Sequence, residues 1–146
     1  MTPSFQHNVG AYVAPVTSVF PQSSAAATIN GASVRRSAHN MPLSCLLHQV
    51  VGAVGGAPSA SSVQTTLQHS PDNATWTNYI PDGASSVAQT PAITAANLGS
   101  GAAVDLSGAF DYIRAVTVIT FTGGTSPTAQ VYSDIILGGE AVLPAI

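Results

Sequence analysis

The sequence is poor in charge. Asp, Glu, Lys and Arg make up only 6% of its residues, against about 25% in a typical soluble domain. It contains no lysine, and Arg35, Arg36 and Arg114 are its only permanently charged cations. Alanine, serine, threonine and glycine fill the positions that charged residues would normally take. Such a surface is weakly hydrated and weakly self-repelling, which favours a subunit that binds other subunits over a free monomer.

Several classes of protein are disfavoured by what is missing. A net charge of −3, with no basic stretch beyond Arg35–Arg36, leaves too few phosphate contacts for nucleic-acid binding. No apolar run is as long as a membrane-spanning helix, and the N-terminal residues do not have the pattern of a signal peptide. The single cysteine, Cys45, excludes an intrachain disulfide. It lies in the apolar run LSCLL, so we expect a buried structural thiol.

Patterns of catalytic and metal-binding residues are missing as well. Most acidic residues lie in or beside predicted turns, where aspartate stabilises the local backbone. The histidines (His7, His39, His48 and His69) are scattered without metal-ligand spacing. Neither a GxSxG nucleophile elbow nor a phosphate-binding loop is present. We therefore predict no catalytic, cofactor-binding or metal-ligating residue, no cofactor, and a non-enzymatic function.

Alternation with a period of two is frequent in the chain. The segments 61–70, 111–121 and 128–137 each place alternate residues on opposite faces, as strands do. Both faces of 111–121 are largely apolar, which predicts a strand inside a sandwich or against a neighbour. Turn residues separate the strands at short intervals. We predict an all-β protein, an antiparallel β-sandwich or jelly roll.

The first 40 residues differ from the rest. They contain Pro3, Pro15 and Pro21 and the low-complexity run SSAAAT. Proline is tolerated at sheet edges, so the stretch AYVAPVTSVF is a candidate edge strand. We predict an N-terminal arm with one or two edge strands over residues 1–40, and a β-sandwich domain over residues 41–146. The arm either packs on a neighbouring subunit or is a frayed terminus.

Two segments of the chain have similar sequences. LHQVVGAVGGAPSASSVQTTLQ begins at Leu47, and VTVITFTGGTSPTAQVYSDIIL begins at Val116. Each runs from an apolar segment into Gly-Gly, then small residues with one proline, then an alternating segment. Because glycine accepts positive φ, we interpret each segment as a β-hairpin, with Gly123 and Gly124 in the second turn. Two such hairpins stacked face to face would form a sandwich. Chance similarity is the alternative.

The stretch LQHSPDNATWTNYIPDG contains the only tryptophan, Trp76. A strand that ends near Ser70, a tight turn around Asp72 and a returning strand predict a hairpin. A buried indole removes a large apolar area from water, so we expect Trp76 to anchor the core. The alternative is an exposed aromatic platform for a sugar, formed by Trp76 and Tyr79.

Over residues 45–139 the sequence resembles small structural proteins of tailed bacteriophages. A strand pattern ending in LQHSPDNATW is followed by YIRAVT, a glycine-rich turn and a last strand that ends in glycine. The matching residues are Leu67, Gln68, Ser70, Asp72, Trp76, Tyr112, Ile113, Arg114, Thr117, Gly123, Gly124, Pro127 and Gly138. The resemblance implies a β-sandwich or jelly-roll module on the virion, such as a capsid cement (decoration) protein. This chain has far fewer charged residues than many such proteins.

From this resemblance we expect a capsid cement protein, made in the bacterial host cytoplasm, that binds the outer surface of the major capsid protein lattice and stabilises the head. The expected partners are the major capsid protein and further copies of the chain, as a homodimer or homotrimer. Neither nucleic acid nor a membrane is expected as a partner. The alternatives are a head-fibre base, a tail or head–tail connector protein, or a carbohydrate-binding module. Since large or charged side chains are rare in this chain, the candidate interface residues are Phe5, Tyr12, Phe20, Arg35 and Arg36.

Overall fold

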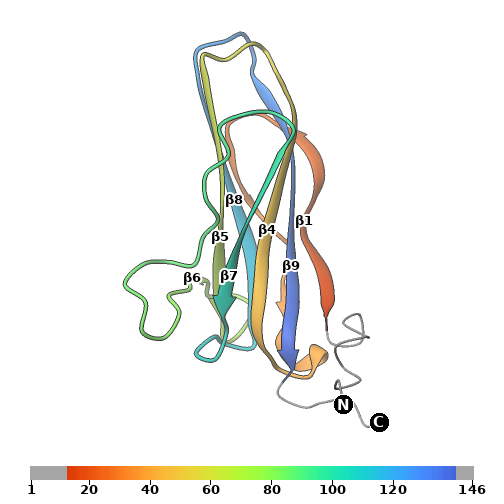
Figure 1. Cartoon of the computed structure of the whole chain (residues 1–146), viewed down its shortest axis with the longest axis vertical. Coiled ribbons are helices and arrows are strands. Elements are labelled where there is room, and N and C mark those ends of the chain that lie inside the picture. The colour runs from red at the N-terminus through yellow and green to blue at the C-terminus, as the bar shows by residue number, and fades with distance from the viewer. Residues whose placement is uncertain (1–12, 141–146) are drawn as a thin grey trace, which may run out of the picture.

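A computed structural model describes residues 13–140 (Figure 1). The elements are β1 (Ala14–Ser24), β2 (Ala27–Asn30), β3 (Val34–Arg35), the 3-10 turn η3 (Arg36–His39), β4 (Pro42–Gly55), β5 (Ala60–Ser70), β6 (Thr77–Asn78), β7 (Leu98–Asp105), β8 (Tyr112–Thr122) and β9 (Thr128–Glu140). Sheet A has the strand order β1-β9-β4-β7. Sheet B has the order β2-β8-β5-β6, and β3 also pairs with β8. In this part of the chain no helix is long and apolar enough to cross a membrane.

The two sheets pack face to face, which confirms the predicted all-β sandwich. The inward residues of β5, β8 and β9 follow the predicted alternation, and Leu67, Ile113 and Ile135 are 0% exposed. Two apolar clusters fill the space between the sheets. The strands are antiparallel throughout both sheets. A strand with a period of two buries one whole face in this arrangement, which is why the pattern was readable in the sequence.

The similar segments are not hairpins, and this prediction was wrong. β4 lies in sheet A and β5 in sheet B, so the chain crosses between the sheets at Gly55–Gly56; it crosses back between β8 and β9 at Gly123–Gly124. We call these two connections the arches, and they lie side by side at the top of Figure 1. Each strand pairs with a strand of the other segment, β4 with β9 and β5 with β8. The loops are long enough to span the roughly 10 Å between packed sheets, whereas a hairpin would return within one sheet.

The two segments pair reciprocally, so equivalent positions of each segment occur in both sheets. In sheet A, Gln49 is opposite Ser133, and in sheet B, Thr117 is opposite Thr65. These four polar residues meet in the centre of the sandwich, all 0–1% exposed. The Thr65 hydroxyl lies 2.9 Å from Oε1 of Gln49, 2.8 Å from the Thr117 hydroxyl and 3.1 Å from the Ser133 hydroxyl. This polar centre separates the two apolar clusters, and its groups satisfy one another as buried polar groups must.

Residues 14–40 supply strands to both sheets. β1 forms one edge of sheet A, and it contains Pro15, Pro21 and two irregularities in its pairing with β9. Prolines and bulges block a further strand from pairing along such an edge. The edge strand was predicted here. Whether residues 1–40 form an arm that binds a neighbour stays a prediction, and residues 1–12 lie outside the described residues.

Cys45 is 5% exposed, as its apolar surroundings predicted. Burial raises the pKa of its thiol to about 12. The thiol is therefore protonated at neutral pH and contributes to packing, not to chemistry.

Candidate interaction surfaces

One end of the sandwich, opposite the arches, is built from three turns: 36–41, 71–84 and 106–111. We call it the loop end (bottom of Figure 1). Arg36 is 2% exposed at its centre. Its guanidinium donates to the backbone carbonyls of Ala109, Phe110 (3.4 Å) and Pro42 (2.8 Å). This buried cation joins the 106–111 turn to the start of β4, so the loop end is a fixed surface.

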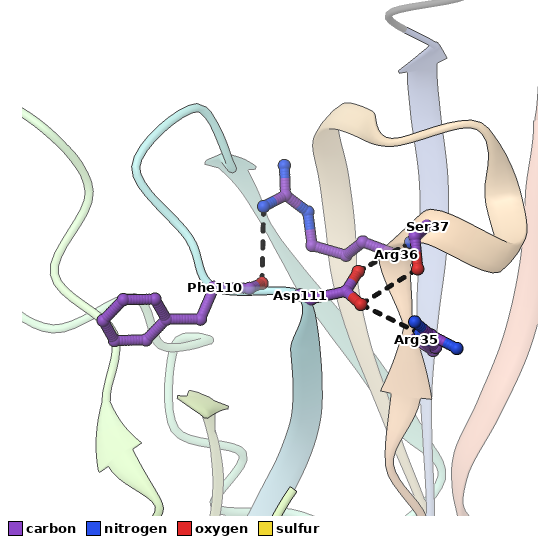
Figure 2. Close-up of polar contacts among 5 residues, drawn as sticks. All are labelled: Arg35, Arg36, Ser37, Phe110 and Asp111. Atoms are coloured by element: carbon purple, nitrogen blue, oxygen red, sulfur yellow. Dashed lines mark hydrogen bonds and ion pairs between the residues drawn. The ribbon is translucent and has the colours of Figure 1, made fainter. Parts of the chain in front are cut away.

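A second set of contacts fixes the same turns from outside (Figure 2). The Asp111 carboxylate accepts from Nε of Arg35 at 2.9 Å, and from the backbone N–H and the hydroxyl of Ser37 at 2.8 and 2.9 Å. The hydrogen bonds from Arg35 and Ser37 outweigh desolvation, which opposes them, and lower the pKa of Asp111. Arg35 is thus neutralised within the chain, although its side chain is 60% exposed.

The 71–84 segment contains β6, which pairs with β5 in a short hairpin, as predicted. Asp72 accepts from the backbone N–H groups of Thr75 and Ala74 at 2.7 and 2.9 Å, and from the Ser70 hydroxyl at 2.8 Å. These donors, the backbone N–H of Thr75 first, lower the pKa of Asp72 strongly. Asp72 therefore holds the turn together through its carboxylate.

Large apolar side chains stand on the loop end without cover from the described residues. Phe110 is 47% exposed, Ile80 50% and Met41 38%. The Phe110 ring stacks on His69 with ring centroids 4.5 Å apart, and its backbone N–H donates to Nδ1 of His69 at 3.2 Å. Burial, and secondarily the Arg36 cation, lower the pKa of His69, so the imidazole beneath Phe110 is held neutral. The loop end therefore presents apolar groups on a rigid support.

The outer face of sheet A is a second apolar surface. Strand alternation places Ile136, Tyr132, Leu46 and Val50 on the side away from the core. On the neighbouring edge strand β7 the outward positions are Gly99, Gly101 and Ala103. A Cβ at Gly101 would lie 3.1 Å from Cδ1 of Leu46, so the missing side chains leave room for the β4 side chains to spread flat over β7. Two open depressions line this face, at Val50–Tyr132 and at Leu46–Ile136.

Polar residues interrupt this apolar face: Ser44, Asp105 and Gln130 lie at outward positions, and a polar pair lies between the rows of Leu46 and Val50. His48 and Asp134 are directly opposite each other on β4 and β9. Nδ1 of His48 lies 3.8 Å from Oδ2 of Asp134, too far for a hydrogen bond, and Nδ1 of His48 and Oδ1 of Asp134 have no partner. Asp134 is only 8% exposed, and its carboxylate raises the pKa of the Tyr132 hydroxyl. The pair thus adds little exposed charge to the face.

The outer face of sheet B differs because polar side chains dominate it. Alternate positions of β5 are Ser62, Gln64, Thr66 and Gln68, and those of β8 include Arg114 and Thr120. The Arg114 guanidinium lies 4.3 Å from the centroid of the Trp76 ring, and its Nε and Nη2 donate to Oε1 of Gln68 at 3.0 and 2.8 Å. The two outer faces of the sandwich therefore have opposite character.

Two predictions about aromatic residues are corrected here. Trp76 does not anchor the core; it is half-buried on the surface beneath Arg114, because its turn places it outside the sheet pairing. Tyr79 has the core position instead, 1% exposed, and its hydroxyl donates to the backbone carbonyl of Asp105 at 2.8 Å. A sugar platform made of Trp76 and Tyr79 is therefore not formed.

The candidate interface residues fall in three different environments. Phe20 is 64% exposed on β1, and Arg35 is exposed beside Asp111. The prediction that Arg36 contacts a partner was wrong. Arg36 is buried in the loop end, where backbone carbonyls surround its guanidinium. Phe5 and Tyr12 lie outside the described residues. Gly123 and Gly124 lie in an arch and not in a hairpin turn.

Sequence reasoning missed both apolar surfaces. Phe110, in SGAFD, is a large apolar residue inside a turn, where no core position is available to it. In LSCLLHQVV apolar residues occur on both alternate faces of β4, a sign that part of the outer side needs cover as well. Both features are visible in the sequence, but the strand topology is needed to show that these residues lie on the surface.

Among residues 13–140, no group of three or more His, Cys, Asp or Glu side chains is arranged to hold a metal ion. No family model, curated protein or solved structure matches the chain. The surfaces described above are thus the basis for a functional proposal.

Proposed function

We propose that the protein is a non-enzymatic virion subunit, a capsid cement protein that binds the outer surface of the major capsid protein lattice and stabilises the head. The observation that carries the proposal is the loop end, where Phe110, Ile80 and Met41 are exposed on turns fixed by internal hydrogen bonds. The resemblance over residues 45–139 to phage structural proteins is the reason for proposing a virion as the place where the protein acts.

The proposed mechanism is mechanical. A rigid surface loses little conformational freedom when it docks, so the entropic cost of ordering its turns on binding is small. Apolar surface that two capsid subunits bury against the loop end contributes roughly 25 cal/mol per Å² to the binding free energy, before the costs of association are subtracted. Separating the subunits would expose that area again to water. Many copies on one lattice add their contributions and make the shell more resistant to internal pressure.

The charge distribution supports an apolar contact over an ionic one. Arg36 is buried, Arg35 is paired with Asp111, and Arg114 lies over Trp76. None of the three guanidinium groups is left as a free surface charge for an acidic partner. Binding through the loop end should therefore depend weakly on salt concentration.

The test is to mix the purified protein with undecorated capsids of the phage that encodes it and to follow co-sedimentation. We expect saturable binding at a stoichiometry that matches the lattice, with raised heat resistance of the capsids. Phe110→Lys should weaken binding at least tenfold. Val118→Lys is the matched control, since Val118 is also an exposed apolar residue, 39%, but lies on sheet B.

Absence of capsid binding would overturn the proposal, and incorporation into tails would favour the tail or connector alternative. Equal losses for the Phe110 and Val118 variants would show that binding does not use the loop end.

A further inference from the structure

We propose that the outer face of sheet A is the interface of a homodimer, with the same face of a second copy as its occupant. This goes beyond the proposed function and does not depend on it, because dimerisation is measured with the protein alone. The starting observation is the contrast between the two outer faces. Sheet A presents Ile136, Leu46 and Val50, whereas sheet B presents glutamine, threonine and serine. An apolar sheet face next to water marks an interaction site.

The size of the face matches what a stable dimer needs. Strands are spaced about 4.8 Å apart and rise about 3.3 Å per residue. Sheet A has four strands, and β9 is 13 residues long. The four strands have 11, 13, 14 and 8 residues, so the face covers about 700 Å². One partner contributes about 800 Å² to an interface of standard size. A twofold dimer built from two such faces needs no other surface of the molecule.

The chemistry of the face favours a copy of itself over a charged partner. The three arginines are on β3, η3 and β8, so sheet A carries none of them. Its central acid, Asp134, is 8% exposed and has His48 opposite it, and its other acid, Asp105, lies at the end of β7 and accepts from the backbone N–H of Ser107 at 2.8 Å. A strongly charged surface would find almost no opposite charge to pair with, whereas an equally apolar face would bury area on both sides.

The shape of the face also suits sheet-on-sheet packing. Gly99 and Gly101 on β7 have no side chains, and the β4 side chains extend over them. A Cβ added at Gly99 would lie 3.5 Å from Nε2 of His48. The β4–β7 half of the sheet is therefore low, with an open depression beside Leu46. Two twisted sheets pack about 10 Å apart with their strands nearly aligned. The arrangement leaves the loop end free at the end of each copy.

The experiment is analytical ultracentrifugation of the full chain between about 1 and 100 μM, since interfaces of this area bind in the micromolar range or tighter. We expect the wild-type protein to be a dimer at the upper concentration. Leu46→Lys should raise the dissociation constant at least 100-fold, because it places a charge in the centre of the buried area. Val118→Lys is the control: Leu46 is 40% exposed and Val118 39%, on opposite outer faces.

Ala103→Arg provides a second variant on the same row of the face, opposite Leu46. It should also give monomers, and urea unfolding of each variant verifies that the fold is intact. A wild-type monomer at 100 μM, well above the micromolar dissociation constants expected of interfaces of this area, would overturn the proposal and leave the face for a different protein. A trimer, or equal dissociation of the Leu46 and Val118 variants, would overturn it as well. Capsid binding by a strictly monomeric protein would refute the dimer while leaving the proposed function intact.

Discussion

Gly56 and Gly124 lie back to back at the arch end of the sandwich. A Cβ on Gly124 would be 2.6 Å from the carbonyl oxygen of Gly56, and the backbone N–H of Thr125 donates to that oxygen at 2.8 Å. Both glycines have positive φ, +77° and +85°. The two arches therefore pack backbone on backbone, which explains why the second residue of each Gly-Gly pair is glycine.

This contact predicts a large cost for a side chain at Gly124. Gly124→Ala should lower the free energy of unfolding by about 3 kcal/mol or more, because backbone must move in addition to the unfavourable φ. Gly83→Ala is the control, since Gly83 has a φ of +78° but nothing within 4 Å of an added Cβ. It should cost about 1 kcal/mol for conformation alone. Urea unfolding measures both, and equal losses would show that the arches do not need their close approach.

Arg36 should be far more important for stability than its neighbour Arg35. Arg36→Met leaves the buried carbonyls of Pro42 and Ala109 without their donor, which should cost about 3 kcal/mol. Arg35→Met removes an exposed ion pair with Asp111 and a contact 5.8 Å from the Tyr112 ring centroid, and it should cost much less, because water screens both. Thermal unfolding of the two variants compares them directly. The reverse order would mean that the Asp111 contacts, and not the buried guanidinium, hold the loop end.

The polar centre of the sandwich can be tested with one isosteric change. Thr65→Val removes the hydroxyl shared by Gln49, Thr117 and Ser133 and should cost about 1–3 kcal/mol. Thr66→Val, one position along on the outer side of the same strand, should change stability by less than about 0.5 kcal/mol. If the Thr65 variant proved as stable as the wild type, the buried hydrogen bonds would contribute nothing net to the fold.

Acid stability should depend on Asp72. The pKa of Asp72 is lowered in the folded state. The stability that its carboxylate contributes is therefore fully present above the pKa of the unfolded chain, about 3.9, and is lost as the pH falls through the folded pKa. Asp72→Asn should therefore be less stable than the wild type at pH 7, and the difference should shrink as the pH is lowered from about 5 to 2. Urea midpoints across this range give the comparison. A constant difference would assign the effect to geometry and not to the charge.

Alternation in the sequence was enough to predict the all-β sandwich. In β5, β8 and β9 the residues predicted to share a face are buried together, because a strand against another sheet must hide one whole face. The pairing of those strands could not be predicted in the same way. A Gly-Gly turn allows both a hairpin and an arch, and the choice depends on whether the better partner is the adjacent strand or a distant one, as in the pairs Thr65–Thr117 and Gln49–Ser133.

Single residues were harder to place than strands. The large area of Trp76 suggested a core position, but the core near β5 is filled by Tyr79, three residues later. Arg36 looked like a surface cation, yet carbonyls of the 106–111 turn and of β4 enclose it. In both cases the environment comes from segments distant in the chain, so local sequence carries little information about it.

The sequence by itself determined the low charge, the strand-and-turn composition and the inward faces of the principal strands, since these depend on residue type and on a local period of two. The tertiary structure alone decided that the repeated segments cross between the sheets, that Arg36 is enclosed, and that two apolar surfaces stay uncovered in residues 13–140. The reason is physical: alternation specifies which side of a strand avoids water, whereas long-range pairing specifies what each side meets.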